Sequence, residues 1–317
     1  MNRKIRYGIS LLVFVLLFSL FYSRNESKPS EVVYMPEDAS QEEILDELYS
    51  RGFIQNKFSY YILKMQIALG GEIEPGGYEL KHSMGALALY ARLVNPEYKY
   101  IRVEEGLRQE EIAELIGEKL DWDESKIDRF ASNLPYCTLS KGEGRLFPGT
   151  YAIHRDEAIS VIKEEMERNL ISNIEEIYNE DDVSNIDLDK VLTIASMIQR
   201  EAAGKQDMRL IAGIIWNRIF KGMPLQIDAT LQYVKGDDEL WWPQVHPKDK
   251  YLDSPYNTYQ NKGLPPGPIA SPGPAAIAAV LDPTATDCLF YLHDKRRNIH
   301  CATTYEGHKQ NINYYLR

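Results

Sequence analysis

The sequence predicts an α+β protein in which an N-terminal apolar segment precedes small βα units and a mostly helical domain with a small β element. Residues 9–22 are apolar apart from two serines, and a strand–turn–helix pattern occurs twice between residues 32 and 155. Two amphipathic helical patterns follow in succession after residue 187. With 317 residues, 44% of them apolar, the chain can form two or three domains with cores of their own.

The charge balance argues against a nucleic-acid partner. The net charge is -11, and lysines and arginines are scattered without the basic stripe that neutralises phosphates. The cysteines Cys137, Cys288 and Cys301 lack the spacing of a metal site, and their odd number leaves at least one thiol free. Whether Cys288 and Cys301 pair stays open from the sequence.

The N-terminus has the features of an export signal. Residues 1–8 carry three basic residues, and the apolar run 9–22 follows them. No small-residue cleavage site and no lipobox cysteine comes next, which favours an uncleaved anchor over a cleaved signal peptide, although the run is shorter than the about 20 residues of an ordinary spanning helix. Basic residues on the short side predict a cytoplasmic N-terminus and an extracytoplasmic body, joined by a polar linker at 23–31.

Residues 32–155 contain repeated strand–turn–helix units. The sequence Gln-Glu-Glu-Ile at 41–44 recurs at 109–112, each time after a predicted strand. Two further short strands, 77–80 and 150–153, each precede a predicted helix N-cap, at Ser83 and Asp156 respectively. Such units are too small to bury a core singly, so we expect them to pack together.

Residues 156–186 are predicted to form a connecting helix and a polar loop before the last domain, 187–317. In that domain, apolar residues at helical spacing place Glu201 at the edge of a buried helix face. Partial burial raises the pKa of a carboxyl group, and a proton held near neutral pH suits a general acid. Taken alone, this segment favours a different interpretation, in which Glu201 is an ordinary boundary residue near the end of a helix. Asp187 or Asp189 is expected to cap the helix, and Gly204 to stop it.

The rest of the domain alternates helices with rigid loops. Asp207 is expected to cap the next helix, and Asp228 is either a second carboxylate or an N-cap, of which the residues alone favour the cap. Aromatic, amide and hydroxyl side chains then gather on loops rich in Pro and Gly, 241–273, which suits sugar binding but also an ordinary surface loop. A helix over 271–281, strands at 289–292 and 298–302, and a helix near His308 complete the chain.

Several ordered motifs together resemble the YceG-like endolytic murein transglycosylases. They are ASMIQRE at 195–201, WNR at 216–218, LQIDAT at 225–230, SPYNTY at 254–259 and GLPPGPI at 263–269. The resemblance covers almost the whole chain and implies a membrane anchor, a LysM-like region over 32–155 and a lysozyme-like catalytic domain over 187–317. A LysM-like region implies binding to N-acetylated glycans, although a spacer fits equally well.

The same resemblance places the family's catalytic glutamate at Glu201. Gln199 stands where the family usually has another glutamate, which leaves Glu201 as the only carboxylate in that segment. Ala202 and Ala229 replace a common threonine and a common proline. Lys309 follows His308 where the family tends to have asparagine, which puts a substrate role for that histidine in doubt.

The resemblance implies cleavage between N-acetylmuramic acid and N-acetylglucosamine within nascent peptidoglycan strands, without water, to give 1,6-anhydro ends. It implies no cofactor and no metal. Membrane-bound peptidoglycan synthases are expected partners, and the cleavage is expected to end strand elongation. Rival interpretations are a hydrolytic muramidase that uses Asp228 as a second carboxylate and an inactive wall-binding scaffold. The expected substrate-binding residues are Gln226, Asp228, Tyr256, Asn257, Thr258 and Tyr259.

Overall fold

A computed structural model describes residues 29–132, 142–178 and 187–317. It confirms the α+β class and divides the chain into two compact units, Met1–Ile101 with Thr150–Glu157, and Arg102–Gly149 with Ala158–Arg317. The expected anchor at 9–22 lies outside the described residues. Within the described ranges, no helix combines the length and the apolar character needed to cross a membrane.

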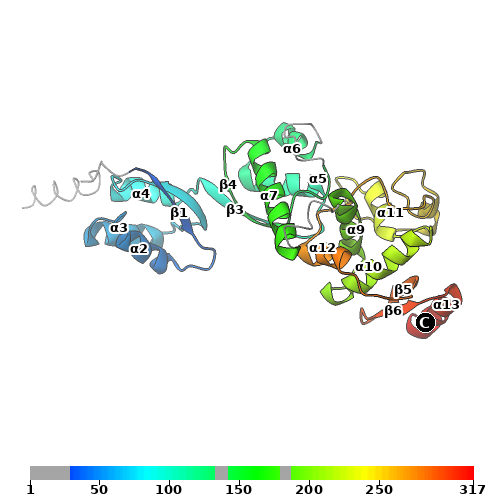
Figure 1. Cartoon of the computed structure of the whole chain (residues 1–317). Helices are drawn as coiled ribbons and strands as arrows, with labels where there is room; N and C mark the ends of the chain where they lie inside the picture. Colours follow the sequence, from blue (N-terminus) through cyan, green and yellow to red (C-terminus); the bar gives the residue numbers. More distant parts are fainter. Residues whose placement is uncertain (1–28, 133–141, 179–186) are drawn as a thin grey trace, which may run out of the picture. The chain divides into compact units, whose positions relative to one another are not determined.

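The first unit is a four-stranded sheet packed with three helices (Figure 1). The strands follow the order β1 (Glu31–Met35), β2 (Gly76–Leu80), β3 (Tyr98–Val103) and β4 (Gly149–His154). β1 and β2 are antiparallel, with Val33 opposite Tyr78. Apolar residues of the first two strands share one core with α2 (Gln41–Ser50), α3 (Lys57–Ala68) and α4 (Ala86–Leu93), because no single βα unit could bury its own apolar face.

The predicted strand–turn–helix repeat is confirmed. α2 begins with a capping box in which Ser40 N donates to Glu43 Oε2 at 2.8 Å. At the equivalent place before α5 (Gln109–Leu120), Arg108 N donates to Glu111 Oε2 at 2.9 Å. The predicted N-caps Ser83 and Asp156 are wrong by two residues, since α4 follows Gly85 and α7 follows Ala158. The structure also divides the predicted 32–155 region, because α5 belongs to the second unit.

The second unit is mostly helical. Its further elements are α6 (Glu124–Ala131), α7 (Ile159–Ile177), α9 (Leu188–Glu201), α10 (Lys205–Phe220), α11 (Asp228–Lys235), the short 3-10 helix η1 (Pro247–Tyr251), α12 (Pro274–Leu281), β5 (Phe290–His293), β6 (Ile299–Ala302) and α13 (Tyr305–Tyr315). One core joins α7, α9, α10 and α12, and every residue of α9 from 191 to 198 is buried. The predicted connecting helix, α7, is therefore part of this core, to which it gives Leu170 and Ile174.

The corner between α9 and α10 is built by an aspartate. Asp187 caps α9 as expected, with Oδ1 accepting from Lys190 N at 3.2 Å. The prediction that Asp207 caps α10 is wrong only in its position: Gly204 is the N-cap, and Asp207 is the third helical residue, whose side chain accepts from the Gly204 N–H. The buried Asp207 carboxylate instead reaches back to Ala203 N at 3.0 Å and Gly204 N at 3.2 Å. This bonding fixes the chain immediately after Glu201.

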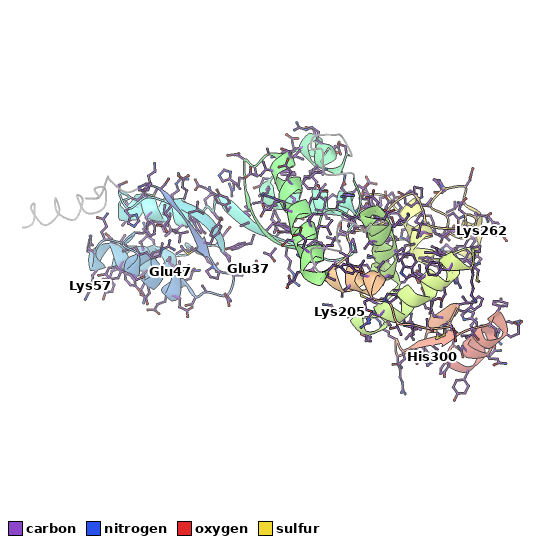
Figure 2. All side chains as sticks on the ribbon, viewed as in Figure 1. Glu37, Glu47, Lys57, Lys205, Lys262 and His300 are labelled. Carbon is purple, nitrogen blue, oxygen red and sulfur yellow. A yellow bond between two sulfur atoms is a disulfide. The ribbon has the colours of Figure 1, made fainter. Side chains whose placement is uncertain are left out.

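The C-terminal hairpin is cross-linked. A disulfide joins Cys288, just before β5, to Cys301 in β6, which pairs directly with Tyr291 of β5. His300 of β6, labelled in Figure 2, stacks on Tyr315 of α13 with ring centroids 3.5 Å apart. The hairpin and α13 therefore form one small packed element; Cys137 lies outside the described residues.

Candidate active site

Glu201 is the last residue of α9, and its carboxylate has two hydrogen-bond donors. Tyr291 Oη donates to Oε2 at 2.8 Å, and Ala229 N donates to Oε1 at 3.4 Å. Burial raises the pKa of Glu201 above its ordinary value, and the nearby Asp228 charge raises it further. The two hydrogen bonds and His293 act in the opposite direction. Glu201 thus has the elevated pKa of a proton donor together with groups that stabilise its charged form.

Strand β5 brings two side chains to the corner between α9 and α10, where Glu201 lies. Tyr291 and His293 are two residues apart and share one face of the strand, with ring centroids 6.0 Å apart. His293 Nε2 lies 2.6 Å from Asp207 Oδ2, and Arg297 Nη2 donates to Ala203 O at 2.6 Å. The hairpin therefore docks on the α9–α10 corner, and burial keeps the pKa of Tyr291 well above its ordinary value. Sequence reasoning missed Tyr291 and His293. They lie 90 and 86 positions from their partners Glu201 and Asp207, and contacts between residues so far apart leave no periodic pattern in the sequence.

The start of α11 provides the second carboxylate. Asp228 is the first helical residue, the N-cap is Ile227, and the prediction of an N-cap at Asp228 is therefore wrong. Its exposed carboxylate accepts a hydrogen bond from Tyr259 Oη at 2.5 Å. Burial and this bond raise the pKa of Tyr259 above its ordinary value. Asp228 precedes Ala229, whose N–H contacts Glu201, so both carboxylates lie at one corner.

Gln226 lies next to this corner with an unusual backbone. Its φ of 54° is in the left-handed region, and its N–H donates to Thr258 O at 3.1 Å. The residue is exposed. The bend lies between α10 and α11 and holds the start of α11 against the 254–259 loop, and it leaves Gln226 at the surface.

Two of the expected substrate residues are buried in the 254–259 loop. Asn257 Nδ2 donates to the carbonyls of Lys250 and Leu252 at 3.2 and 2.7 Å. Thr258 Oγ1 accepts from Ile227 N at 2.9 Å. Their polar atoms thus bond to the protein and fix the loop, which in turn positions Tyr259.

Tyr256 belongs to a separate aromatic contact. Its ring lies 5.0 Å from that of Tyr233, measured between centroids. Burial raises the pKa of Tyr256 above its ordinary value. Tyr233 lies one helical turn after Ala229 on α11, so this pair extends the site along that helix.

One buried arginine holds both segments that contact the Glu201 carboxylate. Arg218 of α10 donates from Nε to Leu289 O at 2.6 Å and from Nη1 to Leu225 O at 2.5 Å. The first carbonyl precedes β5 with Tyr291, and the second precedes α11 with Ala229. Arg218 therefore fixes the two hydrogen-bond donors of Glu201 relative to each other.

Residues beside Glu201 attach α9 to its surroundings. Gln199 Oε1 accepts from Gly273 N at 3.1 Å, and Ser196 Oγ accepts from Ile269 N at 3.0 Å. The Arg200 guanidinium lies 3.7 Å from the centroid of the Trp242 ring. Helix α9 is thereby attached to the Pro- and Gly-rich segment that contains Ile269 and Gly273, and to the loop that contains Trp242. Within the ranges that the structure describes, no group of His, Cys, Asp and Glu could hold a metal ion.

Comparisons with known proteins find relatives along almost the whole chain. The model of the YceG-like family matches residues 33–314. A Bacillus subtilis protein named endolytic murein transglycosylase is 31% identical over 98% of this chain and 89% of its own length. A Streptococcus pneumoniae protein of the same name is 28% identical, and the match covers 96% of this chain but 64% of that longer protein. A crystal structure of a YceG-like protein from Listeria monocytogenes, 28% identical, covers 90% of this chain and 99% of its own, with a TM-score of 0.55.

Proposed function

The chain belongs to the YceG-like family, and we propose that it is a membrane-anchored endolytic transglycosylase that cuts N-acetylmuramic acid–N-acetylglucosamine bonds within peptidoglycan strands. The relatives named endolytic murein transglycosylases support this enzyme class. The observation that carries the proposal is the Glu201 carboxyl, whose pKa is raised by burial while Tyr291 and Ala229 donate hydrogen bonds to it.

The reaction needs one carboxyl group. Glu201 protonates the glycosidic oxygen as the bond from that oxygen to C1 of the muramic acid breaks. The resulting carboxylate takes the proton of the C6 hydroxyl, whose oxygen bonds to C1 and closes the 1,6-anhydro ring. Glu201 is then protonated again. Tyr291 and Ala229 stabilise the carboxylate between the two steps, and holding the C6 hydroxyl beside C1 replaces a second catalytic group.

The exposed polar groups around Glu201 are proposed to position the sugar. Gln226, Asp228 and Tyr259 surround the start of α11, and Tyr256 extends the surface along it. Asn257 and Thr258 are better supported as residues that shape the loop, because their polar atoms are buried and bonded to the protein.

A hydrolytic muramidase is the rival function. Asp228 would then activate water as a second carboxylate. In that role, the hydrogen bond from Tyr259 would orient the Asp228 carboxylate. Mass spectrometry of digested peptidoglycan separates the two, because hydrolysis leaves reducing ends and transglycosylation leaves 1,6-anhydro ends.

An inactive wall-binding scaffold is the rival from another class. Replacing Glu201 by Gln would leave such a scaffold unchanged in its effect on the wall. For the enzyme, the same substitution abolishes cleavage of isolated sacculi while the fold survives. The decisive comparison is sacculus digestion by the two purified proteins.

The anchor at residues 9–22 is proposed to hold the catalytic unit on the outer face of the membrane, beside synthases that make new strands. Cleavage there would end strand elongation, and the LysM-like region would help to bind the wall. Deleting residues 1–22 tests this location: longer glycan strands in cells support it, and unchanged strand length at equal protein level counts against it.

A further inference from the structure

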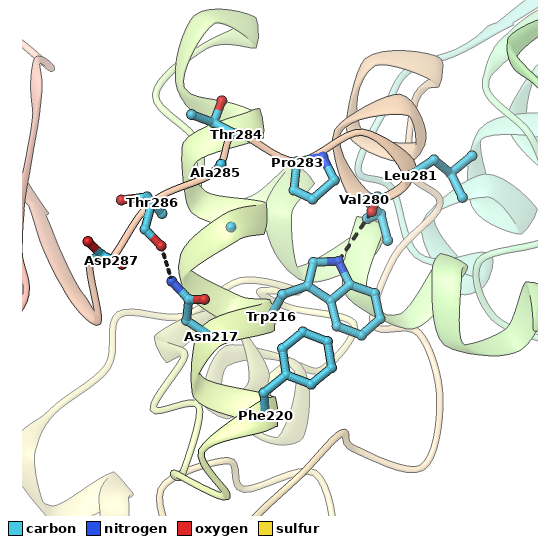
Figure 3. A pocket seen from close by; sticks show the side chains of 11 residues that line it. Trp216, Asn217, Phe220, Val280, Leu281, Pro283, Thr284, Ala285, Thr286 and Asp287 are labelled. Carbon is cyan, nitrogen blue, oxygen red and sulfur yellow. Dashed lines mark hydrogen bonds between the residues drawn. The ribbon is translucent and has the colours of Figure 1, made fainter.

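A groove of about 700 Å³ lies on α10, outside the site described above. Figure 3 shows its floor, the rings of Trp216 and Phe220, and the segment 283–287 that runs along its side. The two rings are stacked, with centroids 5.6 Å apart and planes 18° apart. Phe220 is 79% exposed, which is unusual for a phenylalanine and leaves an open aromatic surface.

The groove is held in shape before any ligand enters. Trp216 Nε1 donates to Val280 O at 3.2 Å, which fixes the indole ring. Asn217 Nδ2 donates to Thr286 O at 2.6 Å, which holds the side of the groove against α10. At Gly213 a Cβ would lie 2.3 Å from Thr284 O, so only glycine allows this close approach. A preformed site loses little conformational entropy on binding.

The rim of the groove is polar and acidic. Thr284 and Asp287 are exposed, and they supply a hydroxyl and a carboxylate beside the aromatic floor. Nearby, Arg209 Nη2 donates to Asp282 Oδ2 at 2.6 Å, so that its charge is offset by a carboxylate. Such a rim disfavours phosphates and other anions and favours a neutral ligand rich in hydroxyl groups.

We propose that this groove is an accessory saccharide site, in which one pyranose ring packs its C–H face on Phe220 and Trp216 and directs its hydroxyls to Thr284 and Asp287. The ligand class is an N-acetylated β-linked glycan. This inference rests on the proposed function, because a second site on one strand would hold a polymer that the active site also engages. Aromatic rings with convergent polar groups are the usual lining of such sites.

The groove is also connected to the active site through the chain. Asn217 contacts Cys288 O as well, at 3.2 Å, and the next residue, Arg218, bonds to Leu289 O. The side of the groove therefore continues into β5 and Tyr291. A glycan strand bound in the groove lies against the segment that leads to Tyr291, a hydrogen-bond donor to Glu201.

Binding of a chitin hexasaccharide to the full chain in detergent tests the proposal, in a Glu201→Gln background that prevents cleavage. Calorimetric titration should show two classes of site. Phe220→Ala should weaken one of them about 3- to 10-fold, the effect of losing one aromatic contact. Phe220→Tyr keeps a ring and should retain the affinity, and Tyr314→Ala, which removes another exposed ring of the same unit, should change nothing.

Two outcomes would overturn the groove proposal: a Phe220→Ala protein that binds the hexasaccharide as its parent does, or a Tyr314→Ala protein that loses as much affinity. Failure of the proposed function is distinguishable from these. If the Glu201→Gln protein still cleaves peptidoglycan, the catalytic assignment fails, whereas the titration continues to decide whether Phe220 binds sugar.

Discussion

The Tyr291 hydroxyl donates a 2.8 Å hydrogen bond to Oε2 of Glu201, although the two residues are 90 positions apart. The bond joins the end of a core helix to a cross-linked hairpin. In the proposed reaction this bond would stabilise the charged carboxylate between the two proton transfers, while burial favours the protonated form that would start it. The balance between these two effects sets the pH range in which the enzyme works.

Glu201→Gln should abolish activity. The amide cannot deliver a proton, and loss of general acid–base catalysis costs about 100- to 10,000-fold in rate. Release of soluble fragments from purified sacculi measures this effect. Asp249→Asn, at a buried aspartate of the same unit, serves as control, and its activity should stay near that of the natural protein.

The same Glu201→Gln substitution should stabilise the fold at neutral pH. The pKa of Glu201 is higher in the folded protein than in the unfolded chain, where it is about 4.3. Ionisation of Glu201 therefore lowers the free energy of unfolding as the pH rises from the unfolded-state pKa to the folded-state pKa. The glutamine side chain does not ionise, so the variant keeps this stability. Thermal unfolding should therefore show a more stable variant at pH 7 and nearly equal proteins at pH 3.5; equal stability at both pH values would contradict the raised pKa.

Tyr291→Phe and Asp228→Asn should shift the pH profile in opposite directions. The Tyr291 bond lowers the pKa of Glu201, so its loss moves the fall in activity at high pH to higher pH. The Asp228 charge raises that pKa, so Asn moves the fall to lower pH. Rates on sacculi across the pH range measure both shifts. Shifts of the same sign would contradict the assigned contacts.

Arg218→Lys should impair catalysis as well as stability. An ammonium group is a single point and lacks the rigid fork of Nε and Nη1 that reaches Leu289 O and Leu225 O, so Tyr291 and Ala229 lose their common support. We expect a free energy of unfolding lower by about 3 kcal/mol, and kcat lower by about 10- to 100-fold. Arg209→Lys, at an exposed arginine of the same helix, is the matched control. A stability loss with unchanged kcat would limit Arg218 to a structural role.

Removal of the disulfide should loosen the hairpin that carries Tyr291. Replacing Cys288 and Cys301 by Ser frees a loop of 13 residues, which costs about 3 kcal/mol in the chain-entropy description. Unfolding in urea measures the loss, and activity should fall because Tyr291 is less well fixed. Cys137→Ser controls for a cysteine-to-serine change that breaks no described disulfide. Equal stability of the double variant and the natural protein would show that the bond contributes nothing.

Local patterns predicted the fold well where one element determines its own structure. The repeated Gln-Glu-Glu-Ile at the starts of α2 and α5 and the buried face of α9 are read from residues within one or two turns. Helix starts were less well predicted: Asp207 and Asp228 favour caps, yet neither is an N-cap, and each also bonds a side chain far along the chain, His293 and Tyr259 respectively. Propensity alone cannot distinguish these uses.

The site depended on contacts that no local pattern contains. The ordered motifs predicted Glu201 as the catalytic residue, but the contacts of Tyr291, His293 and Arg218 arise from the packing of segments far apart in the chain. The expected sugar ligands Asn257 and Thr258 show the same limitation. Their residue types suit a sugar, and only the packed loop shows that their polar atoms are already bonded to the protein.

Digestion of purified peptidoglycan in water enriched in oxygen-18 tests the central claim most directly. If Glu201 alone catalyses an intramolecular reaction, mass spectrometry will find 1,6-anhydro-muramic acid ends without the heavy isotope, and the Glu201→Gln protein will produce none. Reducing ends that carry oxygen-18 would contradict the account, because water and not the C6 hydroxyl would then be the nucleophile.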